Sequence, residues 1–259
     1  MDTFDLHPDL VPAFHAILRK ARRIVVFTGA GASAESGIPT FRDAQVGLWH
    51  RFRPQDLATP EGFLRDPALV YGWYEWRRAK VAAAEPNAGH RAIAAWAQTR
   101  DVTVITQNVD DLHERAGSSR VIHLHGSIFA ARCFDCGAAY KLPPPSVDAA
   151  GTGEAMDPPR CAACNGLIRP GVVWFNENLP QREWAKAEEL CRTADLLLCI
   201  GTSGLVYPAA GLPQVAAQAG APIAQINPEA TDLDALADFN IRGTAGKIMP
   251  RLVAAAMQG

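Results

Sequence analysis

Short apolar runs recur along the chain, and segments with the periodicity of amphipathic helices separate most of them. The apolar runs are 24–27, 102–105, 121–124, 196–200 and 223–226. Runs of this length without polar alternation are typical of strands that are buried on both faces. The helical patterns are 11–21, 181–194, 208–219 and 244–257, the last with Pro250 as an expected interruption. This alternation predicts a Rossmann-like α/β fold, in which helices cover both faces of a parallel sheet.

Two segments break the alternation. Residues 44–98 carry aromatic side chains and helical patterns without a strand pattern, and residues 127–171 carry four cysteines around an irregular loop rich in proline and glycine. We expect both to be insertions that form a smaller lobe, one helical and one a four-cysteine zinc ribbon. The sheet domain would then consist of 1–43, 99–126 and 172–259. Because ligands of open α/β sheets bind at the carboxyl ends of the strands, the active cleft should lie where lobe and sheet meet.

Composition excludes several classes of protein. The net charge of −2 gives no overall field that would attract nucleic acid or a membrane surface. The sequence contains no run of 18 apolar residues, so we expect no membrane span. The acidic first residues do not resemble a signal peptide. Cys191 and Cys199 lie in apolar surroundings and are expected to be buried free thiols. We therefore expect a monomer in the reducing cytoplasm that binds neither nucleic acid nor membrane.

The other four cysteines form two C-x-x-C pairs separated by 24 residues: Cys133 with Cys136, and Cys161 with Cys164. Four thiolates in two such pairs can surround Zn²⁺ tetrahedrally and leave no open coordination position, which favours a structural metal. A redox dithiol and isolated buried thiols are the alternatives. A zinc ribbon that binds DNA is another, but the basic residues nearby are few and scattered.

A glycine-rich loop follows the first apolar run. Residues Gly29–Ala34 fit the pattern G-x-G-x-x-G/A, in which glycines allow the backbone to approach a phosphate at the start of a helix. A tight strand–helix turn without a ligand would show the same pattern. The acidic residue expected about 20 positions later in dinucleotide sites is not evident. The loop therefore does not predict an ordinary hydride-transfer site.

Polar side chains also follow two of the predicted strands. Gln107, Asn108 and Asp110 come after one strand, where they could line a cleft or simply cap a helix. His123 and His125 are two residues apart on another, so they should share one face of it. One of them could be a packed core histidine. Imidazole titrates near neutral pH, as a general base requires.

Five segments, in the same order along the chain, resemble motifs of the sirtuins, a family of NAD-dependent protein deacylases. The matching segments are Gly29–Asp43 (G-A-G-A-S-A-E-S-G-I-P-T-F-R-D), Thr106–Asp110 (T-Q-N-V-D), His125–Gly126, the four cysteines and Gly201–Ser203 (G-T-S). The resemblance implies an enzyme that uses NAD as co-substrate and holds one structural zinc ion. It would convert acylated lysine in proteins to free lysine, with nicotinamide and O-acyl-ADP-ribose as the other products.

The resemblance also implies roles for individual residues. His125 would be the general base for a ribose hydroxyl, and Asn108 and Asp110 would orient the nicotinamide pocket. The residues expected to contact NAD are Gly29, Ala30, Gly31, Ala34, Glu35, Phe41, Arg42, Gln107, Asn108, Asp110, His125, Gly201, Thr202, Ser203, Asn227, Glu229 and Ala245.

Two further segments resemble the strands with which the family clamps an extended substrate peptide. They contribute Val172, Val173, Trp174 and Phe175 on one side and Val206 and Tyr207 on the other. The family usually has glycine where this chain has Asn176, and asparagine tolerates a positive φ better than most residues.

The acyl group is indicated by Tyr74 and Arg77, three residues apart on a predicted helix and therefore on one face. Phenol and guanidinium can together bind a carboxylate, although an aromatic stripe packed on the core with a solvated basic end would show the same pattern. With Ala58 upstream, the pair resembles the sirtuin class that removes succinyl and malonyl groups as well as acetyl groups. The alternatives are an enzyme that is mainly a deacetylase, an NAD-dependent mono-ADP-ribosyltransferase and a non-catalytic NAD-binding module.

Overall fold

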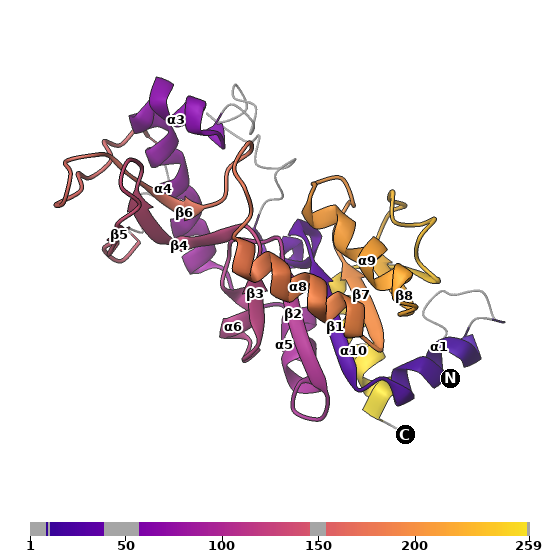
Figure 1. Ribbon diagram of the computed structural model, residues 1–259. Coiled ribbons are helices and arrows are strands. Elements are labelled where there is room, and N and C mark those ends of the chain that lie inside the picture. Colours follow the sequence, from indigo (N-terminus) through magenta and orange to yellow (C-terminus); the bar gives the residue numbers. More distant parts are fainter. Residues whose placement is uncertain (1–8, 10, 39–56, 146–153, 258–259) are drawn as a thin grey trace.

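The computed structural model describes residue 9 and residues 11–38, 57–145 and 154–257 of the 259. Figure 1 shows two sheets at opposite ends of the molecule, each with its own helices. One sheet has six strands and the other has three. No helix in the described part of the chain has the length and apolar character needed to cross a bilayer.

The six-stranded sheet is parallel throughout and has the order β3-β2-β1-β7-β8-β9. Its strands are β1 (Arg23–Thr28), β2 (Asp101–Thr106), β3 (Val121–His123), β7 (Leu196–Ile200), β8 (Ile223–Asn227) and β9 (Phe239–Arg242). The five apolar runs are thus confirmed as strands. The sequence analysis missed β9, because this edge strand alternates buried and half-buried residues and has no apolar run.

Helices cover both faces of this sheet, as predicted. They are α1 (Val11–Lys20), α5 (Ala88–Trp96) and α10 (Ala245–Met257) on one face, and α8 (Gln181–Thr193) and α9 (Leu212–Gln218) on the other. Successive residues of a strand point to opposite faces of the sheet. Val26 therefore packs on the face covered by α1, α5 and α10, and Val25 and Phe27 pack on the face covered by α8 and α9. This double burial explains why the strands read as continuous apolar runs.

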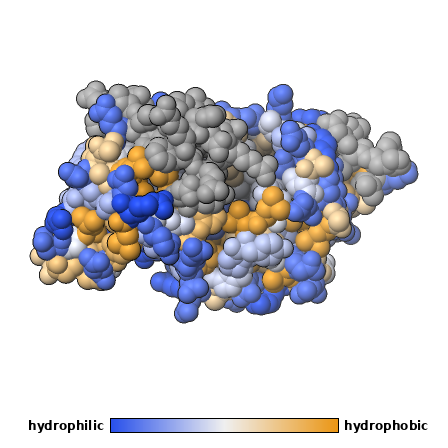
Figure 2. All heavy atoms as spheres, turned by 90° about the horizontal axis from the view of Figure 1, so that it is seen from above, coloured by the Kyte–Doolittle hydropathy of each residue, from blue (hydrophilic) through white to orange (hydrophobic). Residues whose placement is uncertain are grey.

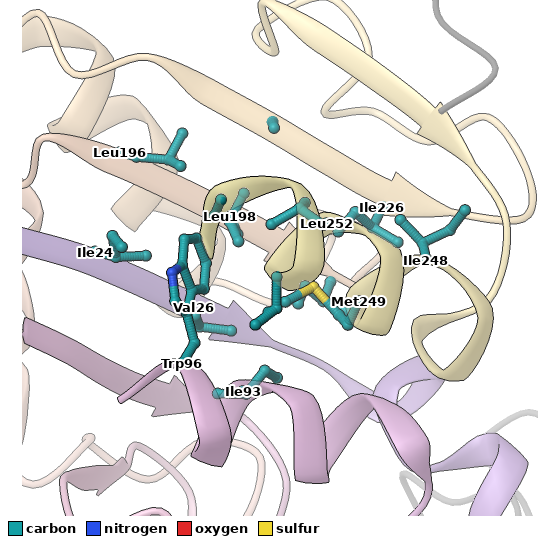
Figure 3. Packing of buried hydrophobic residues seen from close by; sticks show 14 of the residues in the cluster. Ile24, Val26, Ile93, Trp96, Leu196, Leu198, Ile226, Ile248, Met249 and Leu252 are labelled. Atoms are coloured by element: carbon teal, nitrogen blue, oxygen red, sulfur yellow. The ribbon is translucent and has the colours of Figure 1, made fainter. Parts of the chain in front are cut away.

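Helix α5 packs on the large sheet, although it lies within the stretch 44–98 that we assigned to the small lobe. Figure 3 shows Ile93 and Trp96 of α5 beside Val26 and Leu198 of the sheet and Leu252 of α10. The apolar face of α5 is therefore buried in the larger core. The division of the chain between the two lobes otherwise remains a proposal.

Pro250 does not interrupt the last helix, contrary to the expectation from sequence. Helix α10 is continuous from Ala245 to Met257. Proline costs a helix one hydrogen bond and a steric clash. The buried side chains on both sides of it, Met249 and Leu252, are 0% exposed and hold the helix against the sheet.

The small lobe combines an antiparallel sheet with two helices. The sheet has the order β5-β4-β6, with β4 (Gly126–Cys133), β5 (Ala139–Tyr140) and β6 (Ile168–Val172). The helices are α3 (Pro60–Arg65), which Thr59 caps, and α4 (Pro67–Ala83), which Asp66 caps. Trp73 and Trp174 lie in the core between the helices and the sheet. The order of the large sheet leaves a switch point between β1 and β7, where a ligand cleft is expected.

Candidate active site

The glycine-rich loop lies at this switch point and contacts the loop after β7. The N–H of Gly29 donates to Ile200 O at 3.0 Å, and the N–H of Gly31 donates to Gly201 O at 2.9 Å. A Cβ on Gly31 would lie 2.7 Å from the Cα of Gly201, and Gly201 itself has a φ of +59°. Only glycine allows the two loops to approach this closely. We refer to the backbone of these two loops as the cradle, because a dinucleotide pyrophosphate would be expected at this switch point.

The element after this loop differs from the expected α-helix. It consists of two single turns of 3₁₀-helix, η2 (Ala30–Ala32) and η3 (Ala34–Ser36). Gly37, with a φ of 78°, ends the second turn in the left-handed conformation. An anion here would therefore meet the backbone of short turns instead of the N-terminus of an α-helix.

The substitution Gly31→Ala tests the cradle. We expect it to weaken NAD binding by about tenfold or more, because overpacking of about 1–3 kcal/mol must move one of the two loops. The NAD dissociation constant from calorimetry measures the effect. Gly211→Ala is the matched control, since a Cβ there meets no atom within 4 Å. Equal NAD affinity of both variants would contradict the role of the cradle.

Asn108 and Asp110 lie against the glycine-rich loop, and Ser33 joins them. The Asn108 side-chain amide donates to Gly29 O and to Ser33 Oγ, both at 3.1 Å. The Ser33 hydroxyl donates to Asp110 Oδ2 at 3.0 Å. Sequence reasoning missed Ser33, although it carries the only hydroxyl between Gly29 and Ala34. The hydroxyl fixes both polar side chains relative to the loop.

Asp110 also serves the helix that follows it. Its Oδ1 accepts the N–H of Leu112 at 3.2 Å, at the start of α6 (Leu112–Arg115). Asp110 thus satisfies one N–H group at the start of this helix as well as contacting Ser33, although the N-cap position itself is Asp111, whose side chain makes no capping bond. Burial raises the pKa of Asp110, while the Leu112 N–H and the Ser33 hydroxyl oppose that rise.

Gln107 and Asn227 meet at the loop after β7. The Gln107 side-chain amide donates to Thr202 Oγ1 at 2.9 Å, and the Asn227 amide donates to Thr202 O at 3.1 Å. Thr202 is buried and Ser203 is half-buried. The structure therefore brings the segments after β1, β2, β7 and β8 together at one edge of the sheet.

His125 lies in the turn between β3 and β4, so the prediction that it shares a strand face with His123 is wrong. Strand β3 ends at His123, and Gly126 begins β4 with a φ of 73°. His125 Nδ1 lies 2.9 Å from Gln107 O. A carbonyl only accepts, so the neutral ring carries its proton on Nδ1 and keeps the lone pair on Nε2. Burial lowers the pKa of His125 despite the Gln107 carbonyl, so the ring is neutral at pH 7.

His123 has the opposite character. Its Nε2 lies 2.7 Å from Glu114 Oε1 and its Nδ1 lies 3.2 Å from Asn108 O. Burial lowers the pKa of His123, but the Glu114 carboxylate outweighs burial and raises it above its ordinary value. His123 is therefore hydrogen-bonded through both ring nitrogens, whereas the Nε2 of His125 has no hydrogen-bond partner among the residues that the structure describes.

The other residues expected to contact NAD are spread over several segments. Glu35 accepts from the Thr244 hydroxyl at 2.9 Å and from the Gly246 N–H at 2.6 Å, so its carboxylate binds the first turn of α10 around the buried Ala245. Glu229 is exposed beyond β8. Phe41 and Arg42 lie outside the described residues.

The first expected peptide-clamping segment contains the end of a strand followed by a turn, and the second forms no strand. Strand β6 ends at Val172, and residues 205–208 are an irregular loop with a cis Tyr207–Pro208 bond. Phe175, Val206 and Tyr207 are 40%, 40% and 75% exposed. The N–H of Val173 donates to His125 O at 2.9 Å, so the backbone of the first segment is already paired on one side. Figure 2 shows patches of hydrophobic surface across the middle of one face of the molecule.

The turn after β6 has the positive φ at Asn176 that was expected from the sequence. Asn176 has a φ of 68°, a conformation in which asparagine replaces glycine at low cost. The N–H of Phe175 donates to Ala58 O at 2.9 Å. Ala58 itself is buried, and Val173 is half-buried. The turn is thus fixed to the segment that precedes α3.

Tyr74 and Arg77 both lie on α4, Tyr74 in the core of the small lobe and Arg77 half-buried. Tyr74 accepts the Trp174 indole N–H at 2.9 Å. The Arg77 guanidinium carbon lies 4.9 Å from the centre of a Trp73 ring. Burial raises the pKa of Tyr74 to about 12, with the Arg77 cation opposing the rise. Burial lowers the pKa of Arg77, and the nearby Tyr74 and Asp110 oppose this decrease.

The four cysteines form one cluster in the small lobe, as predicted. The Sγ atoms of Cys133 and Cys164 are 3.4 Å apart, those of Cys136 and Cys161 are 3.7 Å apart, and all four lie within 4.8 Å of one another. Four thiolates at 2.3 Å from a tetrahedral zinc ion would be about 3.8 Å apart. The cluster therefore fits Zn²⁺.

Two matched turns support the cluster. Gly137 and Asn165, which follow the second cysteine of each pair, have φ values of 73° and 61°. Backbone N–H groups of Cys136 and Asp135 lower the pKa of the Cys133 thiol to about 7, which favours the thiolate that binds metal. The Gly166 N–H lowers the pKa of Cys164, but the neighbouring thiols outweigh it and raise it to about 12. A cation among the sulfurs would favour the ionised form of all four thiols.

Comparison with known proteins agrees with this geometry. The model of the Sir2 family matches residues 29–208. A protein of Methylococcus capsulatus named NAD-dependent protein deacylase is 57% identical over 241 residues, which cover 93% of this chain and 94% of that protein. NAD-dependent protein deacylase 1 of Pseudomonas aeruginosa is 51% identical over 244 residues, or 94% of this chain and 98% of the relative.

Solved structures give the same result. The crystal structure of a Sir2 homologue in complex with NAD superimposes with a TM-score of 0.88 at 43% identity, and covers 97% of this chain and 95% of its own. A mutant Sir2 homologue in complex with 2′-O-acetyl ADP-ribose superimposes with a TM-score of 0.85, also at 43% identity, over 95% of this chain and 96% of its own. The family match, the relatives and the fold together show that the chain belongs to the Sir2 family.

Proposed function

We propose that this Sir2-family protein is an NAD-dependent protein-lysine deacylase that removes succinyl and malonyl groups, and also acetyl groups, from lysine. The products would be free lysine, nicotinamide and O-acyl-ADP-ribose. The names of the relatives from Methylococcus capsulatus and Pseudomonas aeruginosa support the class of reaction. The pair formed by the buried Tyr74 and the half-buried Arg77 carries the proposal for the acyl group.

The chain supplies a base and a polar pocket for this reaction. Bound NAD would provide the ADP-ribosyl group that accepts the acyl group. His125 Nε2, with its lone pair, would take a proton from a ribose hydroxyl. Ser33 holds Asn108 and Asp110 on the glycine-rich loop, where they would orient the nicotinamide end. Phe41 and Arg42 would cover the ribose.

The zinc ion would have no part in the chemistry. Cys133, Cys136, Cys161 and Cys164 supply all four positions of a tetrahedral site, so none remains for water or substrate. The metal would instead hold β4 and β6, which carry Gly126 beside His125 and the peptide-binding turn after Val172.

The proposed acyl specificity rests on the positive charge of Arg77 and on the hydrogen-bond donor of Tyr74. Arg77 stays cationic at neutral pH even with its lowered pKa, because a guanidinium is very weakly acidic. Tyr74 stays protonated, and its oxygen already accepts from Trp174, so its O–H is the donor that remains. A cation and an O–H group together suit a carboxylate. Ala58 would leave space for the longer acyl chain.

Tyr74→Phe and Arg77→Met test this specificity. We expect each to raise KM for a succinyl-lysine peptide by about 10- to 100-fold, because each removes a hydrogen bond to a charged group. KM for the acetyl-lysine peptide should rise much less. Steady-state kinetics on matched acetyl-, malonyl- and succinyl-lysine peptides measure the effect.

Tyr71→Phe provides the matched control, since Tyr71 is a buried tyrosine one turn earlier on α4. Equal effects of Tyr74→Phe on acetyl and succinyl substrates would refute the carboxylate pocket. An enzyme that is mainly a deacetylase would show little wild-type activity on the acidic acyl groups. A mono-ADP-ribosyltransferase would leave label from NAD on the target protein.

A further inference from the structure

We propose that Trp174 is a positioning residue for acyl specificity, which fixes the Tyr74 hydroxyl so that its O–H is left for the acyl carboxylate. The inference rests on the proposed desuccinylase and demalonylase function. It assigns to the indole of Trp174 a task that differs from the backbone pairing expected of residues 172–175.

The contact between the two side chains is specific. The indole N–H of Trp174 donates to the Tyr74 oxygen at 2.9 Å, and the two rings lie 6.2 Å apart at an angle of 38°. Trp174 is 2% exposed, so its ring lies in the core of the small lobe. A phenol has one proton to donate. With an indole N–H bound to its oxygen, that proton must point elsewhere.

A second set of contacts holds Trp174 in place. The Arg169 guanidinium carbon lies 3.3 Å from the centre of a Trp174 ring. Arg169 donates to Glu177 Oε2 at 3.0 Å, and the same oxygen accepts the backbone N–H of Trp174 at 2.8 Å. The ring and the backbone of Trp174 are therefore both anchored to one ion pair.

In this arrangement, the residues that recognise the charge of the acyl group differ from the residues that would carry out the reaction. Glu177 and Arg169 fix Trp174, Trp174 fixes the Tyr74 oxygen, and Tyr74 presents a donor next to Arg77 on α4. Acetyl-lysine has no distal carboxylate that could accept a hydrogen bond from the Tyr74 hydroxyl. Loss of the indole N–H should therefore affect acidic acyl groups selectively.

Trp174→Phe removes the N–H and keeps an aromatic ring beneath Arg169. We expect KM for the succinyl-lysine peptide to rise by about two- to tenfold relative to KM for the acetyl-lysine peptide, the effect of one neutral hydrogen bond. A peptide with a neutral succinamoyl group, the amide isostere of succinyl, should resemble the acetyl peptide. The selective effect on KM is a readout that general loosening of the lobe would not produce.

Trp96→Phe is the matched control. Trp96 is 0% exposed, and its Nε1 has no hydrogen-bond partner in the part of the chain that the structure describes. The same substitution there removes an equal volume and no hydrogen bond. It should leave the ratio of the two KM values as in the wild type.

A double-mutant cycle decides whether Trp174 acts through Tyr74. In the Tyr74→Phe background, Trp174→Phe should add little to the rise in the succinyl KM. Additive effects, or equal effects on acetyl and succinyl peptides, would overturn the inference and leave the proposed function standing. Absence of wild-type activity on succinyl and malonyl peptides would overturn both. If Trp174→Phe does not fold, Trp174→Tyr, which also keeps a ring under Arg169, takes its place in the cycle.

Discussion

Replacement of His125 by Ala or Tyr is expected to lower kcat by about a hundredfold or more while the protein stays folded, because general base catalysis contributes about 10²–10⁴ to a rate. His125 offers an unprotonated Nε2 at neutral pH, since the Gln107 carbonyl holds the proton on Nδ1. Its neighbour His123 is engaged with Glu114 and cannot substitute for it. Release of nicotinamide and deacylated peptide measures turnover.

The fold should tolerate this change. The His125 side chain makes one hydrogen bond to a backbone carbonyl, which is worth about 1 kcal/mol. Thermal unfolding and far-ultraviolet circular dichroism should therefore stay close to those of the wild type. His123→Gln is the matched control, with a smaller loss of activity. Full activity of a folded His125→Ala protein would disprove the role as base.

The pH dependence of kcat/KM identifies which histidine is the base. Burial lowers the pKa of His125 below its ordinary value of about 6.5, so the neutral, active form persists on acidification and is lost only below that pH. The acid limb should therefore have its midpoint below pH 6.5. The pKa of His123 is raised. A midpoint above pH 6.5 would point to His123 and contradict the assignment.

Removal of the metal is expected to unfold the small lobe. Structural zinc sites contribute about 10–16 kcal/mol of apparent binding free energy in small domains, which is comparable to the stability of a whole domain. Cys161→Ala should lose the zinc ion and expose β4 and β6 to solvent, while the large sheet keeps its core. Metal analysis and hydrogen exchange of β4 and β6, compared with β1 and β7, measure this local effect.

Cys191→Ala is the control for this experiment. Cys191 is a fully buried thiol of α8 in the core of the large lobe, and burial raises its pKa to about 12. Its replacement should cost about 1 kcal/mol from lost packing and leave the zinc content unchanged. If chelation or Cys161→Ala left the stability of the small lobe unchanged, the site would not be structural.

The local sequence pattern was sufficient to predict most strands of the large sheet. It failed for the elements whose position depends on tertiary packing. Strands β1 and β7 are buried on both faces, so their sequences are apolar throughout. The edge strand β9 has two half-buried positions and no such run. Helix α5 has an apolar face that fits either lobe by sequence, and only the position of Trp96 beneath α10 assigns it to the large core.

The sequence by itself determined the family resemblance, the parallel sheet and the four metal ligands, because each is signalled by short motifs or runs whose residues are neighbours in the chain. The tertiary structure alone decided the state of the site residues. His125 and His123 differ because one meets the Gln107 carbonyl and the other meets Glu114. The contact between Trp174 and Tyr74 joins positions 100 residues apart. A pKa and the direction of an O–H depend on such distant partners and on burial, and no local pattern encodes either.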